Sequence, residues 1–151
     1  LAWERACFDA AVSDLFGYHA LQLGLPEVDA LQTNRMPHQW LAMQDAAAVA
    51  QLDQPEDVLA CDFTALPFPE NSVDLVVLPH TLDLSADPHA TLREVERVLV
   101  PDGRVIVCGF NPASLWGLRQ RRAELYRHIG GGQGYLPEDT GRIGYCSEHV
   151  H

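Results

Sequence analysis

Two continuous apolar segments, joined by one clear helix start, constrain the fold of this sequence more than any other feature. Residues 73–78 read VDLVVL and residues 104–109 read RVIVCG. Between them, Asp87-Pro88 is typical of a helix start, with an N-cap aspartate and a proline at the first helical position. Strands that are apolar on both faces occur in parallel sheets, where helical crossovers cover the faces. Residues 73–109 therefore predict a β-α-β unit.

The rest of the chain repeats this alternation. Further strands are expected at 18–24, 38–43 and 58–63, and helices at 1–16, 26–31, 46–52 and 114–129. In the helix after Asp87, a solvated face is expected to consist of Arg93, Glu94, Glu96 and Arg97. The alternating order predicts an α/β fold with an open, mostly parallel sheet and right-handed crossovers. A length of 151 residues fits one domain, 1–151, with a single core.

Charge and composition narrow the partners and the chemistry. The net charge of −11 repels a phosphate backbone, so no nucleic acid partner is expected. No apolar run approaches the roughly 20 residues of a membrane-spanning helix, and no signal peptide is expected. All ten basic residues are arginines, which excludes a Schiff-base lysine. The four cysteines form no C-x-x-C pair, so we expect reduced thiols in a cytoplasmic protein.

The expected strand ends locate a ligand site. In open α/β sheets, ligands bind beyond the carboxyl ends of the strands, near the switch in strand order. In this chain those ends carry Gln22 to Gly24, Asp45, Asp62-Phe63, Pro79-His80 and Gly109. We therefore expect the functional residues among these side chains.

The central segment also resembles a known family. An acid-x-x-x-Leu-Pro-Phe turn begins at Asp62, an Asp-Leu-Val-Val strand at Asp74 and a Leu-x-Pro-x-Gly break at Leu99. In this order and spacing, the motifs look like class I S-adenosylmethionine-dependent methyltransferases of the type 11 group. The resemblance covers residues 18 to about 112 and is clearest over 58–109. It implies a Rossmann-like sheet, S-adenosylmethionine as cofactor and methyl transfer to a small-molecule acceptor.

The resemblance also implies individual cofactor contacts. They fall on Gln22, Gly24, Asp45, Asp62, Phe63 and Pro79. Asp62 would accept a hydrogen bond from the adenine amino group, and the Phe63 backbone would contact the adenine ring. Asp45 would take the place of the acid that binds the ribose hydroxyls, although it also suits a helix N-cap. Gly24 would be the first glycine of the cofactor loop.

The methyl side of the site is implied to lie at Pro79 and His80. An unperturbed imidazole titrates near neutrality, so His80 is the candidate for a general base. The alternative is a histidine that satisfies a loop carbonyl. Asp83 either assists His80 or caps the next turn. A base is optional, because methyl transfer from a sulfonium depends mainly on aligning donor and acceptor.

Two regions depart from the family pattern. Gln22 replaces the acid before the cofactor loop, and Pro26 falls near the second glycine. Glycines let a backbone approach a ligand closely, and an acid attracts a cation-bearing cofactor. Only 42 residues follow Gly109, too few for the family's full ending of a helix and an antiparallel hairpin, so the chain is either truncated or closes its edge differently. The alternative function is therefore a non-catalytic methyltransferase-like binding or interaction domain that has lost normal cofactor binding.

The C-terminal motifs have simpler interpretations. Four arginines between residues 119 and 127 suit an anionic acceptor or a solvated helix face. Cys146, His149 and His151 lie at the chain end, so no metal site is predicted. Gly130–Gly134 lacks the Lys-Ser/Thr of a phosphate loop and is expected to be a linker.

No G-x-G-x-x-G follows the first strand, which disfavours a nicotinamide enzyme. The oligomeric state is not specified.

Overall fold

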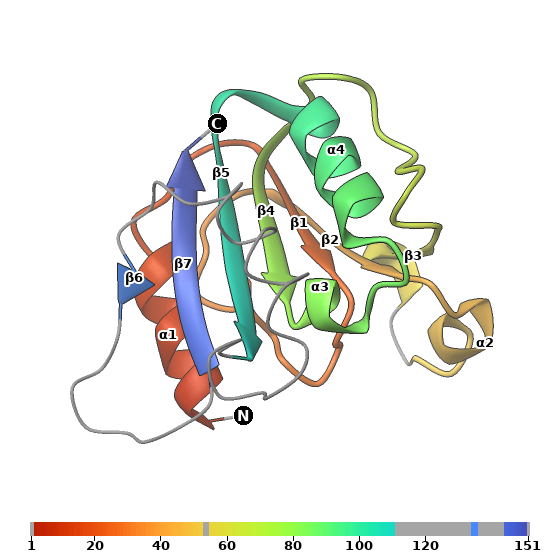
Figure 1. Cartoon of the computed structure of the whole chain (residues 1–151), viewed down its shortest axis with the longest axis horizontal. Coiled ribbons are helices and arrows are strands. Elements are labelled where there is room, and N and C mark those ends of the chain that lie inside the picture. The colour runs from red at the N-terminus through yellow and green to blue at the C-terminus, as the bar shows by residue number, and fades with distance from the viewer. Residues whose placement is uncertain (1, 53–54, 111–133, 136–143, 151) are drawn as a thin grey trace.

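One mixed sheet organises the computed structural model, which describes residues 2–52, 55–110, 134–135 and 144–150. The strand order is β3-β2-β1-β4-β5-β7-β6 (Figure 1). The strands are β1 (His19–Leu23), β2 (His38–Met43), β3 (Val58–Ala60), β4 (Val73–Pro79), β5 (Leu99–Phe110), β6 (Gly134–Tyr135) and β7 (Gly144–Val150). Strands β1 to β5 pair in parallel, as predicted. The doubly wound order places the switch between β1 and β4.

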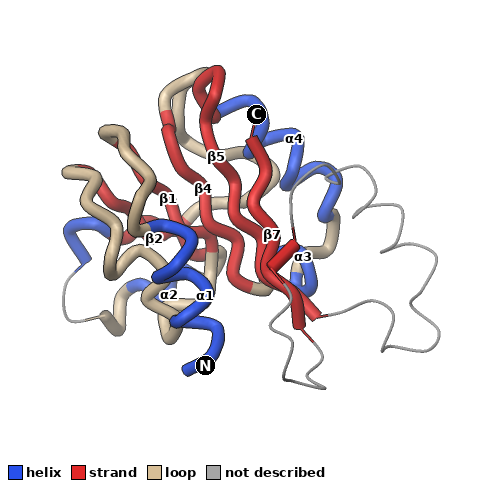
Figure 2. Tube along the Cα trace, turned by 90° about the vertical axis from the view of Figure 1, so that its left-hand side faces the viewer, coloured by secondary structure: helices blue, strands red, loops and turns tan. Residues whose placement is uncertain are grey.

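Helices cover both faces of the sheet. They are α1 (Ala2–Val12), α2 (Ala46–Val49), the 3-10 turn η1 (Pro55–Asp57), α3 (Thr81–Leu84) and α4 (Pro88–Val98). Figure 2 shows α1 and α4 on opposite sides of the strands. The predicted helix at 114–129 and the arginines within it lie outside the described residues, as do the side chains of Cys146 and His149.

The core confirms that β4 is buried on both faces. Leu75 and Val77 pack with Phe8 and Val12 of α1, whereas Val76 packs on the opposite face with the apolar stripe of α4. Val95 and Val98 form this stripe, and Asp87 caps the start of the helix by accepting a hydrogen bond from the Ala90 N–H at 3.0 Å. Side chains on alternating sides of a continuous apolar strand thus hold a helix on each face.

One local expectation is wrong, and two elements were not predicted. The segment 26–31 forms turns rather than a helix, and the short helix α3 follows β4 directly. Beyond β5, β7 pairs antiparallel with β5, and β6 pairs antiparallel with β7. The chain therefore closes this side of its sheet with antiparallel strands in spite of the short segment after Gly109.

All five parallel strands end at one edge of the sheet, which lies at the bottom of Figure 1. Helix α1 begins at the same edge. Loops after β1, β2, β3 and β4 therefore converge there, and this edge positions the candidate site.

Candidate functional site

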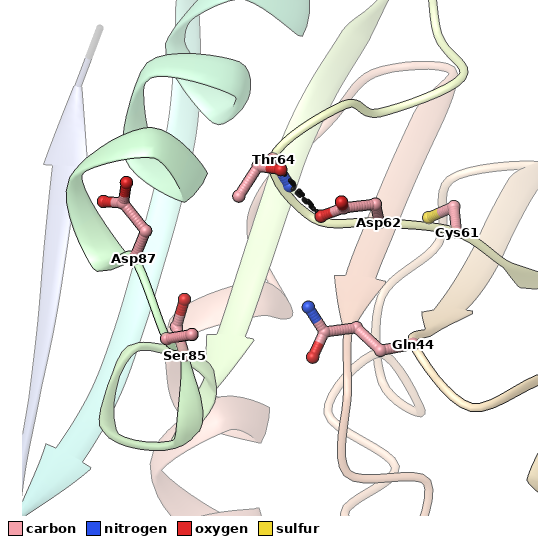
Figure 3. Close-up of a pocket in the computed structure, with 7 residues that line it drawn as sticks. Gln44, Cys61, Asp62, Thr64, Ser85 and Asp87 are labelled. Atoms are coloured by element: carbon pink, nitrogen blue, oxygen red, sulfur yellow. Dashed lines mark hydrogen bonds between the residues drawn. The ribbon is translucent and has the colours of Figure 1, made fainter.

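A pocket of about 430 Å³ opens at the carboxyl edge of the sheet. Its lining residues are Gln44, Cys61, Asp62, Thr64, Ser85, Ala86 and Asp87 (Figure 3). Gln44 follows β2, residues 61–64 follow β3, and residues 85–87 connect α3 to α4. The pocket thus joins two neighbouring strand ends to the segment that begins the crossover after β4.

Asp62 lies at this pocket with an ordered carboxylate. The backbone N–H and the hydroxyl of Thr64 both donate to Asp62 Oδ1 at 2.8 Å. The backbone hydrogen bond from Thr64, followed by its hydroxyl, lowers the pKa of Asp62. Asp62 is therefore a preoriented, ionised acceptor at neutral pH, on a solvent-exposed turn.

Helix α4 holds the turn that follows Asp62. The Leu66 N–H donates to Glu94 Oε2 at 2.8 Å, while Arg97 donates to the carbonyls of Leu66 at 2.9 Å and Phe68 at 3.0 Å. Arg97 also donates to both carboxylate oxygens of Glu94, which lowers the pKa of Glu94. Of the four side chains expected on a solvated face, Arg93 and Glu96 are exposed. The expectation is wrong for Glu94 and Arg97, because these side chains fix the loop that carries the family motif.

Asp45 is engaged in local structure. Its Oδ1 accepts a hydrogen bond from the Ala47 N–H at 2.9 Å and so caps α2, as the N-cap prediction required. The residue that extends from the end of β2 into the pocket is Gln44 (Figure 3). Sequence reasoning missed Gln44 because a glutamine in a short loop carries no pattern of its own.

Gly24 and Phe63 come together at the ends of β1 and β3. Gly24 has a φ of +78°, a conformation that favours glycine. A Cβ built there would lie 3.8 Å from both the Phe63 ring and the Thr81 hydroxyl. That hydroxyl donates to the Leu23 carbonyl and ties the end of β4 to the end of β1. Thr81 is a second residue that the sequence did not indicate.

Gln22, in contrast, is turned into its own loop. Its side chain is buried and hydrogen-bonds to the backbone of residues 24–30. Pro79 is also buried, at the end of β4. The structure therefore brings Gly24 and Phe63 into contact, with Asp62 beside Phe63, and places Asp45 and Gln22 in structural hydrogen bonds.

His80 lies between two carboxylates. Its Nδ1 is 3.2 Å from Asp83 Oδ2, and its Nε2 is 2.8 Å from Glu4 Oε1 of α1. The hydrogen bond to Asp83 is the largest cause of a raised His80 pKa, which burial opposes and Glu4 reinforces. Both ring nitrogens thus lie beside carboxylates, and these contacts favour the charged form of the imidazole over the neutral form that acts as a general base.

Among the described residues, two of the four non-glycine residues with positive φ lie at the same edge. Leu25 and His80 have φ values of +47° and +52°, in the left-handed region that costs a non-glycine residue about 1–3 kcal/mol. These residues follow the adjacent strands β1 and β4. The other two are Asn71 and Asp102, which lie away from this edge.

Cys61 adds a thiol to the pocket. Burial, with a smaller contribution from the neighbouring Asp62 charge, raises its pKa to about 11. The thiol is therefore protonated at neutral pH and is a poor nucleophile.

Among the residues that the structure describes, no group of three or more His, Cys, Asp or Glu side chains could hold a metal ion. No helix in this part of the chain is long and apolar enough to span a bilayer.

Comparison with known sequences gives one consistent family. Residues 37–107 match the family model described as a methyltransferase domain. The uncharacterized protein YafS of Escherichia coli is 37% identical over 106 residues, which cover 70% of this chain and 41% of YafS. The malonyl-[acyl-carrier protein] O-methyltransferase of Halorhodospira halophila is 39% identical over 74 residues, which cover 49% of this chain and 25% of that enzyme. The chain thus spans less than half the length of these relatives.

Comparison with solved structures gives the same fold. An S-adenosylmethionine-dependent methyltransferase from Mesorhizobium loti superposes with a TM-score of 0.70 at 13% identity, over 97% of this chain and 96% of that one. Identity this low speaks for the fold alone. Together with the sequence match over residues 37–107, which includes the Asp62 turn and α4, this shared fold confirms the predicted resemblance to class I S-adenosylmethionine-dependent methyltransferases.

Proposed function

We propose that the carboxyl edge of this sheet binds S-adenosylmethionine and that the protein transfers its methyl group to a small-molecule acceptor. The observation that carries the proposal is the Asp62 turn. Thr64 occupies Oδ1 with two hydrogen bonds, so we assign the second oxygen, Oδ2, to the adenine amino group. Phe63 follows at once with its backbone beside the same pocket.

The pocket lining supports a nucleoside without phosphate. Asp62 and Asp87 contribute two carboxylates, and Gln44 and Ser85 add neutral polar groups. Adenine amino and ribose hydroxyl groups donate hydrogen bonds to such acceptors, whereas the phosphates of a dinucleotide would meet two negative charges. We assign the ribose to Gln44 rather than to Asp45, because only Gln44 is among the residues that line the pocket.

The methionine end of the cofactor is proposed to lie between Gly24 and Pro79. Gly24 borders Phe63 and Thr81, and Thr81 follows Pro79 and His80 directly. His80 then lies at the rim of the methyl site, where its contacts with Glu4 and Asp83 favour the charged ring over a neutral base. The protein's contribution to the reaction is alignment of the sulfonium methyl with the acceptor, which needs no proton transfer at this residue.

A non-catalytic binding domain is the second candidate. It is favoured by Gln22, whose side chain serves its own loop, and by the two carboxylates that occupy the His80 ring. We keep a cytoplasmic location as a proposal too, since Cys7 and Cys61 are free thiols.

A thermal-shift titration separates the two candidates. S-adenosylhomocysteine at 100 times its dissociation constant should stabilise the protein by about 2.7 kcal/mol, which is roughly 5–11 °C in melting temperature for a domain of this size. The dinucleotide NAD at equal concentration should give no shift. If the folded protein shows no shift with S-adenosylmethionine or S-adenosylhomocysteine at millimolar concentration, the methyltransferase proposal fails and the non-catalytic candidate gains support.

A further inference from the structure

The side chain of Gln22 makes an unusually complete set of contacts with one loop. Its Nε2 lies 3.0 Å from the Gly24 carbonyl, 2.9 Å from the Leu25 carbonyl and 2.7 Å from the Val28 carbonyl. Its Oε1 accepts from the Ala30 N–H at 3.0 Å. The residue is only 4% exposed. A single buried amide therefore binds four backbone groups between residues 24 and 30.

The chemistry of these partners requires an amide at position 22. Three carbonyl oxygens surround one end of the side chain, and only a donor satisfies them. The N–H of Ala30 at the other end requires an acceptor. A carboxylate supplies the acceptor but places a negative charge against three carbonyls in a buried site. The acid that the family pattern has at this point would be incompatible with the loop of this chain.

The same contacts explain how the loop turns without a second glycine. Gly24 and Leu25 both have positive φ, at +78° and +47°. Their carbonyls are drawn toward Gln22, and the hydrogen bonds offset the strain of a leucine in this conformation. The carbonyl and N–H of a trans peptide point in opposite directions, and cis bonds are absent from the described residues. The Leu25 N–H therefore points away from Gln22.

We propose that Gln22 is a positioning residue, whose buried amide holds loop 24–30 in the shape that receives the methionine end of the cofactor. This inference rests on the proposed function of the carboxyl edge. Gln22 acts through the backbone of Gly24 and Leu25 and does not touch the cofactor itself. Its amide takes over the task of shaping the loop that closely spaced glycines perform in the family pattern.

The test is the variant Gln22→Glu, with S-adenosylhomocysteine binding measured by calorimetry between pH 5 and pH 8. The introduced carboxyl is isosteric with the amide but loses both N–H donors when ionised. Burial against carbonyl oxygens should raise its pKa above the usual value of about 4.3. We expect binding at pH 8 to weaken about tenfold or more, the equivalent of one lost buried hydrogen bond. Binding should recover toward pH 5, where the protonated carboxyl again donates, whereas the wild-type affinity stays flat.

Asn34→Asp is the matched control. Asn34 is also a buried carboxamide, with its Nδ2 2.9 Å from the Val12 carbonyl and its Oδ1 3.0 Å from the Met36 N–H, but it joins the connection to α1 away from the site. We expect this variant to lose stability and keep its affinity. Gln22→Met, which retains volume and has no titrating group, should bind weakly at every pH and covers the case in which Gln22→Glu does not fold at pH 8.

The outcomes separate the inference from the function on which it rests. If the wild-type protein does not bind S-adenosylhomocysteine, the proposed function fails. If the wild type binds and Gln22→Glu and Gln22→Met bind equally well at pH 8, the positioning role of Gln22 is overturned. An equal loss of affinity in Asn34→Asp would also overturn it, because the effect would then follow general stability.

Discussion

Two loops at the carboxyl edge reach an ordered shape by different routes. The loop after Asp62 follows the family pattern and is fixed by Glu94 and Arg97, which lie 28 to 31 positions away in sequence. The loop after β1 departs from that pattern and is fixed by Gln22, from within eight positions. In both loops, a side chain satisfies backbone carbonyls that would otherwise lack an intraloop partner.

The difference shows that a loop can be ordered even where the family's sequence motif is missing. The glycine-rich sequence was absent, yet the loop is closed by four hydrogen bonds from one buried amide. The Asp62 turn, in contrast, has its motif and still depends on a distant ion pair. Loop shape can therefore be specified by a single buried side chain as well as by backbone flexibility.

The largest effect is expected when the Gln22 amide, which fixes the loop after β1, is replaced by a carboxylate. Gln22→Glu should lower the free energy of unfolding at pH 8 by about 3–5 kcal/mol, the usual cost of an uncompensated buried charge. The folded-state pKa of the introduced carboxyl is raised, so the loss appears above its unfolded pKa and disappears as the pH falls. Urea unfolding at pH 5 and pH 8 measures it. A loss that is equal at both pH values would contradict the buried-carbonyl explanation.

Removing the negative charge of Asp62 should mainly affect cofactor binding. Asp62→Asn retains Oδ1 as an acceptor for Thr64 but loses the charge opposite the adenine amino group. Hydrogen bonds to charged groups contribute about 1.5–3 kcal/mol, so the dissociation constant of S-adenosylhomocysteine should rise at least about tenfold. Calorimetry at pH 7.5 checks this. Asp45→Asn is the control and should bind normally; unchanged affinity in Asp62→Asn would remove the proposed adenine contact.

Releasing the loop after Asp62 from α4 should lower the free energy of unfolding by a smaller amount. Arg97→Ala removes the donors to the Leu66 and Phe68 carbonyls on a partly exposed site, and we expect a loss of about 1–2 kcal/mol in the free energy of unfolding. Arg93→Ala changes an exposed arginine of the same helix and should stay within about 0.5 kcal/mol of the wild type. Denaturant unfolding compares the two. Equal effects would mean that Arg97 does not hold the loop.

The smallest effect is the pH dependence of stability that His80 causes at the end of β4, beside both loops. The raised His80 pKa means that its contacts with Asp83 and Glu4 stabilise the protein below the unfolded pKa of about 6.5, and that this stability is lost as the pH rises through the folded pKa. His80→Asn tolerates the left-handed backbone and does not titrate. The melting temperature of the wild type should fall relative to this variant between pH 6 and pH 8. Parallel curves would show that His80 is not stabilised as a cation.

The fold could be predicted from the sequence because burial leaves a periodic trace. The apolar residues of β4 and α4 indicate which faces are buried, and Asp87 marks where α4 begins. Strand β2 occupies the predicted residues His38–Met43. The same reasoning placed Asp62, Phe63 and Gly24 at one edge. It missed Gln44 and Thr81, since single polar residues in short connections have no period to detect.

What the sequence by itself determined is the alternation of strands and helices, the parallel sheet that they form and the resemblance to a family of methyltransferases. Only the tertiary structure decided how each polar side chain is used. Glu4 reaches His80 across 76 positions, Arg97 holds a loop that precedes its helix, and Gln22 binds backbone groups that a linear pattern cannot place. Hydrophobic burial repeats along a strand or helix, whereas a hydrogen bond depends on the path of the chain between its two partners.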